Sequence, residues 1–350
     1  MSLDRSADDV AWCYDAVQRV SRTFALTVSQ LSEPMSRDIC VGYLLCRVAD
    51  TVEDATHVPP ADQRRVLETY GRVLDPADPT KPDAFADAVA PWVPEDHGAD
   101  WAVVADAPRV LRVFEAMEPA PRRRIRGPVR ELVDGMATFV DRYAEDGGLR
   151  LQTVEELEEY CWYVAGTVGV LVSDLLAVDG AGDGERLREH ARPFSLLLQL
   201  VNVTRDVRRD YAAENNVYVP REYLETAGLD AEDIADPSNG EAFAPVVERL
   251  VDRATGYLDG AQAWLEVMPR VRGNTLSAWA IPFLLAVGTL RELDARPGEV
   301  VGGEPVKVSR AEVRAVVQRF EGDAEPDVAA LRETIRRRPL HLATGDVRGD

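Results

Sequence analysis

The chain has 350 residues, of which 46% are hydrophobic, and a formal net charge of −21, because 61 acidic residues outnumber 40 basic ones. This length and apolar content suffice for one large core, and the negative charge argues against nucleic acid and anionic lipid as partners. Lys81 and Lys307 are the lysines and the other basic residues are arginines, a composition that resembles a halophilic protein from a high-salt cytoplasm.

Two further features bear on location. The sequence contains no run of 18 or more apolar residues, so we expect no transmembrane helix. The cysteines lack the spacing of metal ligands, which favours reduced, buried thiols. These cysteines are Cys13, Cys40, Cys46 and Cys161. We therefore expect a cytoplasmic protein, with a peripheral membrane contact left open.

Apolar positions recur at i, i+3, i+4 and i+7 along most of the chain, which predicts an all-helical protein. The first half should contain helices over 8–30, 37–54, 102–117 and 125–146, another after the turn at 57–65, and a surface loop over 75–98. The second half should contain helices over 154–176, 184–213, 241–268 and 274–293, and a short helix within 215–230. We expect one domain over 1–322 and a charged tail over 323–350 that is partly helical or disordered.

Local signals mark some of these boundaries. Pro34 should end the first helix, and Pro282 should kink the helix over 274–293. Thr153 followed by Glu156 forms a capping-box pattern at the start of the helix over 154–176. A glycine-rich stretch after Leu176 should end that helix.

Two acidic clusters lie within apolar segments. Asp50, Glu53 and Asp54 form the first, and Asp206 and Asp210 form the second. Residues at i, i+3 and i+4 share one face of a helix. Buried carboxylates must be paired or bound to metal. Two such helices facing one another across a cavity would bind Mg²⁺, which in turn would hold a diphosphate.

Four motifs in order give the chain a family resemblance. They are SRTF at 21–24, CRVADTVEDA at 46–55, YCWYVAGTVG at 160–169 and NVTRDVRRDY at 202–211. Together they resemble the squalene/phytoene synthase family of head-to-head prenyl transferases, over about residues 10–320. The resemblance implies the all-α isoprenoid synthase helical bundle around a central apolar cavity.

Features of the squalene branch include DTVED, the segment at 277–290 and the basic strip VKVSR at 306–310, whereas VYVP at 217–220 resembles the phytoene branch. The resemblance thus implies a Mg²⁺-dependent farnesyl-diphosphate farnesyltransferase that makes squalene with NADPH. Three alternatives remain open: a non-reducing phytoene or dehydrosqualene synthase, a non-catalytic helical assembly protein, and a head-to-tail elongator, which the absence of a DDxxD motif disfavours.

The resemblance also implies roles for individual residues. Tyr160 would act at the proton loss, as a base or as a cation-stabilising ring, beside the catalytic and metal-binding carboxylates Asp50, Asp54, Asp206 and Asp210, with Glu53 as a further ligand. Substrate contacts are expected from Arg22, Tyr43, Arg47, Gln199, Asn202 and Arg205. NADPH contacts are expected from Arg22, Arg47, Arg205 and Lys307.

Other interpretations of these residues stay open. The other interpretation of the arginines is charge balance against neighbouring carboxylates, and that of Tyr43, Gln199 and Asn202 is a place in the core. Gly166 inside a helix indicates either close packing or room for a prenyl chain. Ala278 stands where the squalene branch usually has Phe, with Trp279 next to it, and Asn215 and Asn216 stand where the family tends to have Arg.

Overall fold

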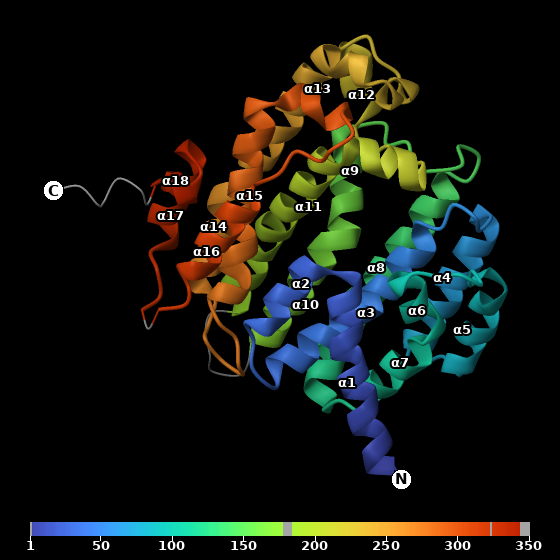
Figure 1. The fold of residues 1–350 in the computed structure, drawn as a ribbon. Helices are drawn as coiled ribbons and strands as arrows, with labels where there is room; N and C mark the ends of the chain where they lie inside the picture. The colour runs from blue at the N-terminus through green and yellow to red at the C-terminus, as the bar shows by residue number, and fades with distance from the viewer. Residues whose placement is uncertain (1, 178–183, 323, 344–350) are drawn as a thin grey trace. The chain divides into compact units, whose positions relative to one another are not determined.

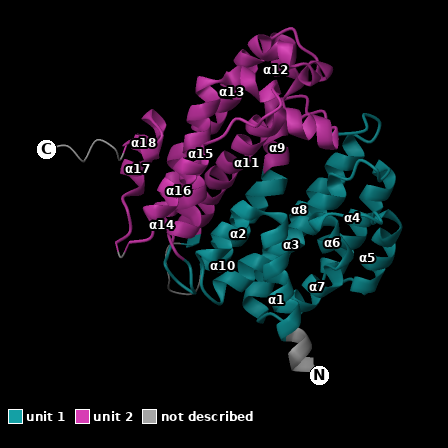
Figure 2. Cartoon of the chain, viewed as in Figure 1, with its two compact units in different colours: residues 1–149, 162–184, 269–274 teal, residues 150–161, 185–268, 275–350 magenta. Residues whose placement is uncertain are grey.

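The computed structural model of the chain describes residues 2–177, 184–322 and 324–343. Within these residues there is no β-strand, and an isolated bridge joins Arg150 to Val217. The chain divides into two compact units, coloured in Figure 2. Unit 1 comprises 1–149, 162–184 and 269–274, and unit 2 comprises 150–161, 185–268 and 275–350. The glycine-rich stop at 178–183 and the end of the tail at 344–350 lie outside the described residues.

Unit 1 is built around α3 (Figure 1). Most residues of this helix are buried, as expected for a helix enclosed by its neighbours. It packs against α1, α4, α6, α7, α8 and α10. The helices of this unit are α1 (Ser2–Val20), α2 (Arg22–Ser29), α3 (Met35–Glu53), α4 (Pro60–Leu74), α5 (Pro82–Val89), α6 (Ala99–Ala105), α7 (Ala107–Glu115), α8 (Pro119–Arg142) and α10 (Thr167–Leu176), with the 3₁₀ turn η1 (Ala90–Trp92) and the π-turn η2 (Trp162–Gly166).

Three expectations for unit 1 differ from the structure. The helix expected over 102–117 is divided at Asp106 into α6 and α7. The helix expected over 8–30 is two helices, because Ser21 has an extended backbone and its Oγ accepts a hydrogen bond from the Phe24 N–H at 3.2 Å, capping α2. The loop expected over 75–98 contains α5, which starts at Pro82 and buries Phe85 against the Tyr70 ring, with centroids 4.8 Å apart. Proline suits the first helical turn, so its presence did not exclude a helix here.

The loop over 269–274 belongs to unit 1 because it hydrogen-bonds the segment before α3. The Ser32 N–H donates to the Gly273 carbonyl at 2.8 Å, and the Met35 N–H donates to the Arg272 carbonyl at 3.1 Å. The Arg272 guanidinium also donates to Oδ2 of the fully buried Asp38 at 2.6 Å. Gly273 has φ of 88°, and a Cβ there would lie 2.2 Å from the Ser32 carbonyl oxygen. Only glycine therefore fits where this loop meets the segment before α3.

In unit 2, the helices α13, α14, α16 and α17 pack against α15 (Figure 1). Its elements are α9 (Val154–Cys161), α11 (Gly184–Glu214), α12 (Arg221–Thr226), α13 (Gly240–Thr255), α14 (Leu258–Val267), α15 (Ser277–Ala295), α16 (Arg310–Gln318), α17 (Val328–Arg337) and α18 (Leu340–Ala343), with 3₁₀ turns η3 (Ala231–Ala235), η4 (Pro237–Asn239) and η5 (Pro297–Val301). Pro282 lies inside α15, which continues past it to Ala295. The helix expected over 241–268 is divided at Gly256 and Tyr257 into α13 and α14.

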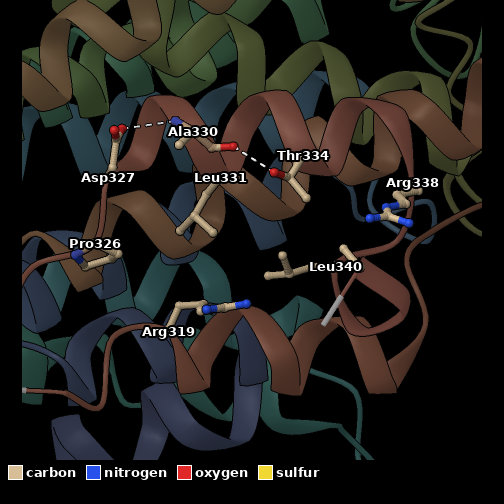
Figure 3. Close-up of a pocket in the computed structure, with 9 residues that line it drawn as sticks. Arg319, Pro326, Asp327, Ala330, Leu331, Thr334, Arg338 and Leu340 are labelled. Atoms are coloured by element: carbon tan, nitrogen blue, oxygen red, sulfur yellow. Dashed lines mark hydrogen bonds between the residues drawn. The ribbon is translucent and has the colours of Figure 1, made fainter. Parts of the chain in front are cut away.

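The C-terminal helices belong to unit 2 and pack against its other helices. α17 contacts α15, and Ile335 on α17 and Leu340 on α18 are buried. Between α16 and α17 lies a surface hollow of about 420 Å³ (Figure 3). The Asp327 carboxylate caps α17 at its edge by accepting a hydrogen bond from the Ala330 N–H at 3.0 Å. The lining of this hollow includes none of the site residues expected from the sequence.

The described residues also bear on the membrane and cysteine expectations. None of their helices combines the length and the apolar content that crossing a bilayer requires. Cys13, Cys40, Cys46 and Cys161 are all buried and free, as predicted. Burial raises the pKa of Cys13 and of Cys46 to about 12, so these thiols stay protonated and unreactive at neutral pH.

Candidate functional site

The first acidic cluster lies at the C-terminal end of α3. Asp50 and Glu53 are on its last turn, and Asp54 is the capping residue, whose N–H donates to the Asp50 carbonyl at 3.0 Å. The side-chain amide of Gln63 on α4 donates to the carbonyls of Val52, Glu53 and Ala55 at 3.0, 2.7 and 3.1 Å. The last carbonyls of a helix lack a full set of intrahelical donors, so Gln63 fixes the end of the helix that carries the carboxylates.

The Gln63→Ala variant should therefore be less stable by about 1–3 kcal/mol, because it removes the buried hydrogen bonds that Gln63 donates at the end of α3. Urea unfolding monitored by far-UV circular dichroism measures this loss. The matched control is Gln318→Ala, at an exposed glutamine, which should change the free energy of unfolding by less than about 0.5 kcal/mol. Equal, small effects in the two variants would show that Gln63 does not cap α3.

Arg47 pairs with one carboxylate of the first cluster. Its guanidinium forms an ion pair with Asp50 and donates through Nε to Asp100 Oδ1 at 2.8 Å. Burial raises the pKa of Asp50, and the nearby Arg47 lowers it only in part. One turn earlier on α3, the Tyr43 ring stacks on Phe24 of the SRTF motif, with centroids 4.0 Å apart and planes 15° apart. The sequence analysis gave no site role to Asp100 or to Phe24.

The second cluster lies on α11, where Asp206 and Asp210 share one face and are 3% and 7% exposed. Arg205 forms a two-point ion pair with Asp206, with Nε 3.1 Å from Oδ1. Arg209 Nη2 lies 3.3 Å from Asp206 Oδ2 and 3.2 Å from Asp210 Oδ1, so one cationic group contacts both carboxylates. The sequence analysis identified Arg205 but missed Arg209, although both belong to the same motif.

Asp210 remains short of positive charge. The pKa of Asp210 is raised to about 6, because burial and the Asp206 charge raise it and Arg209 and Arg205 oppose them only in part. A carboxylate in this environment gains from any additional cation.

The carboxylates of both clusters have the chemistry of Mg²⁺ ligands. Within the described ranges, no group of three or more His, Cys, Asp or Glu side chains is arranged to hold a metal ion. The α11 carboxylates instead face Arg205 and Arg209. Their donor chemistry fits nevertheless, because carboxylate oxygens are the ligands that Mg²⁺ takes, and Arg209 shows that a single cation reaches both Asp206 and Asp210.

Tyr160 is buried in unit 2, on the last turn of α9. Its ring stacks on Tyr218 with centroids 5.0 Å apart, and its hydroxyl donates to the Tyr218 hydroxyl oxygen at 3.3 Å. The Asn216 side-chain amide donates to the same oxygen at 3.1 Å. Glu158 anchors α9 through an ion pair with Arg253, whose Nη2 lies 2.6 Å from its carboxylate.

The segment after α11 explains one departure from the family pattern. Asn215 ends the helix with φ of 56°, a left-handed conformation that asparagine tolerates well. Its side-chain oxygen accepts from Arg150 Nη2 at 2.8 Å. The Asn216 N–H donates to the Asp210 carbonyl at 3.2 Å, which ties the Tyr218 segment to the acidic helix.

Comparison with known proteins decides the family. The family model for squalene/phytoene synthase matches residues 17–340. The chain belongs to the squalene/phytoene synthase family. The Botryococcus squalene synthase of Botryococcus braunii is 29% identical over 287 residues, which cover 80% of this chain and 57% of that protein. The chain spans about 57% to 64% of the length of the curated relatives that it matches.

Solved structures share the fold. The complex of TcSQS with the ligand E5700 has a TM-score of 0.78 at 23% identity and covers 97% of this chain and 93% of that chain. A dehydrosqualene synthase in complex with ligand has a TM-score of 0.65 at 20% identity and covers 95% and 100% of the two chains. The predicted all-α isoprenoid synthase helical fold is therefore confirmed. The central cavity and the single domain over 1–322 stay predictions.

The squalene/phytoene synthase motif YCWYVAGTVG is not one regular helix. It runs from α9 through the π-turn η2 into α10, and π-turns are frequent at functional sites. A Cβ on Gly166 would lie 2.4 Å from the Trp162 ring, and the indole N–H donates to Glu131 at 3.0 Å. Close packing of Trp162 thus accounts for Gly166.

The remaining expected residues have varied environments. Arg22, Asn202 and Lys307 are exposed, and Gln199 is half-buried. Thr153 caps α9 as predicted, accepting from the Glu156 N–H at 3.2 Å. Ala278 is fully buried, and Trp279 packs edge-on against Trp264 with centroids 5.7 Å apart.

Proposed function

We propose that this chain is a squalene synthase, which condenses two farnesyl diphosphates through presqualene diphosphate and reduces the product with NADPH. The observation that carries the proposal is the family match over 17–340, with every expected carboxylate of both acidic clusters present. Asp206 and Asp210 are buried, and the Arg209 guanidinium contacts both of them. This arrangement supports a role for the two carboxylates in binding a metal–diphosphate group.

Asp50, Glu53, Asp54, Asp206 and Asp210 would hold Mg²⁺. When bound, Mg²⁺ neutralises the charge that develops on the departing diphosphate. The carboxylates would exchange their arginine partners for the metal, and the released guanidinium groups would then bind diphosphate oxygens.

Arg47 and Arg205 are placed for such an exchange, because each is paired with a proposed metal ligand. A guanidinium presents a planar fork of donors that matches phosphate oxygens. The same arginines, with exposed Arg22 and Lys307, are the candidates for the phosphates of NADPH. Tyr43, Gln199 and Asn202 are proposed to contact the prenyl substrate.

Tyr160 would act on the carbocation. A buried aromatic ring stabilises a neighbouring cation without offering it water. Its hydroxyl lies within a hydrogen-bonded network rather than in solvent. The coupling step ends when a proton leaves the substrate, and Tyr160 is the proposed first acceptor.

The assay that tests the proposal is incubation of the purified chain with farnesyl or geranylgeranyl diphosphate, Mg²⁺ and either NADPH or no reductant. We expect squalene with NADPH and presqualene diphosphate without it, identified by gas chromatography and mass spectrometry. A product that does not depend on NADPH would instead support the second candidate, a dehydrosqualene or phytoene synthase, which the VYVP segment favours. No turnover of either substrate would support a non-catalytic relative.

A peripheral membrane contact for product release is a further proposal. Leu342 on α18 is 61% exposed, the large hydrophobic side chain that stands out on the described surface. Exposed Arg336, Arg337 and Arg338 lie just before it in the chain. Sedimentation with neutral and with anionic phospholipid vesicles, with Leu342→Ser as the comparison, tests this contact. The high-salt habitat also stays a prediction, tested by activity across a KCl series.

A further inference from the structure

The Tyr160 hydroxyl has a defined neighbour that the sequence analysis did not identify. It donates to the Tyr218 hydroxyl oxygen at 3.3 Å, and that oxygen also accepts from Asn216 Nδ2 at 3.1 Å. The ring stacking keeps the two tyrosines parallel to within 26°. The three side chains therefore form a directional hydrogen-bond series in unit 2, with Tyr218 as its central acceptor.

We propose that Tyr218 relays the proton that Tyr160 takes from the substrate. This inference rests on the proposed function. A neutral phenol is a poor base, because its reference pKa is about 10 and its protonated form is strongly acidic. Tyr160 becomes an effective acceptor when it gives up its own proton as it gains the new one. Tyr218, which already accepts that proton as a hydrogen bond, is the group that takes it.

The step balances as follows. A C–H bond of the coupled cation breaks, and its electron pair forms the last bond of the cyclopropane ring. The proton goes to the Tyr160 oxygen, the Tyr160 proton goes to the Tyr218 oxygen, and the Tyr218 proton goes to the diphosphate anion released in the ionisation. No oxidant or reductant is consumed.

Asn216 favours this direction of transfer. A hydrogen bond donated to a phenol oxygen stabilises the phenolate, so Asn216 makes the Tyr218 proton easier to release. Val203, Val207 and Ile234 line the same small hollow as Asn216 and Tyr218. Apolar surroundings strengthen hydrogen bonds, so the series should be well ordered.

The testing variant is Tyr218→Phe, which keeps the stacked ring and removes the relay hydroxyl. Formation of presqualene diphosphate without NADPH should fall at least tenfold in kcat, with KM changed less than threefold. The solvent deuterium isotope effect on this step should disappear, which a merely structural role would not produce. Asn216→Ala should lower the same kcat about three- to tenfold, and supplies the test if Tyr218→Phe does not fold.

The matched control is Tyr223→Phe. Tyr223 is as buried as Tyr218, at 7% and 9% exposure, and packs beneath Arg249 in α13. This variant should retain parent kcat and isotope effect. Parent-like turnover in both Tyr218→Phe and Asn216→Ala would overturn the relay while leaving the proposed function intact. A parent chain that turns over no prenyl diphosphate would overturn the proposed function, and the relay with it.

Discussion

The Asp210→Asn variant should be more stable than the parent chain above pH 6 and should lose turnover. The folded pKa of Asp210 is about 6, against 3.8 when unfolded, so folding favours the protonated carboxyl. The stability that this protonation contributes is fully present below pH 3.8 and is lost as the pH rises through 6. The folded and unfolded pKa values of Asp210 differ by roughly two pH units. At pH 8 the ionised carboxylate therefore lowers the free energy of unfolding by about 3 kcal/mol.

Urea unfolding of both proteins at pH 4 and pH 8 measures this effect. At pH 4 the free energy of unfolding of the variant should be close to that of the parent. At pH 8 it should be higher by most of the 3 kcal/mol, or by about half of it if the surroundings of Asp210 relax. The comparison variant is Asp206→Asn, where the replaced carboxylate has Arg205 and Arg209 as partners. That variant should be destabilised by about 1–3 kcal/mol, because two guanidinium groups lose a charged acceptor. Changes of the same sign in both variants would contradict the charge environments described for α11.

The sequence predicted the two helices that carry the acidic clusters because their burial pattern is local. Asp50 and Asp206 follow long apolar stretches, and α3 and α11 end within a residue or so of the predicted limits. Thr153 was predicted for the same reason, since a cap depends on residues only three positions apart. The family motifs then supplied the roles, which spacing alone could not.

The features that escaped prediction depend on contacts between distant segments. Gln63 caps α3 from another helix, and Asp100 reaches Arg47 across 53 positions of the chain. Tyr218 is 58 positions from Tyr160, and nothing in VYVP indicates a stacked phenol. Arg209 could have been found, because it follows Asp206 by three positions, a spacing that brings two side chains together on one face of a helix.

Removing Mg²⁺ should abolish turnover, and the Arg209→Gln variant should reveal whether the metal acts on the α11 carboxylates. In the parent chain Arg209 contacts both Asp206 and Asp210, so a bound metal must compete with it. Without Arg209 the two carboxylates repel each other more strongly, and the free energy gained from a divalent cation grows. We expect the variant to melt at a lower temperature than the parent in EDTA and to show a larger Mg²⁺-dependent rise in Tm.

Differential scanning fluorimetry in EDTA and across a Mg²⁺ series measures both shifts, and Ca²⁺ at equal concentration separates specific binding from ionic strength. The matched control is Arg221→Gln, because Arg221 has a side chain as exposed as that of Arg209, at 62% and 64%, and pairs with Glu225 on the surface of α12. That variant should respond to Mg²⁺ as the parent does, since a single exposed ion pair contributes about 0–1 kcal/mol. If Arg209→Gln and Arg221→Gln gain equally from Mg²⁺, the metal does not bind at Asp206 and Asp210, and these carboxylates serve only to orient the arginines of α11.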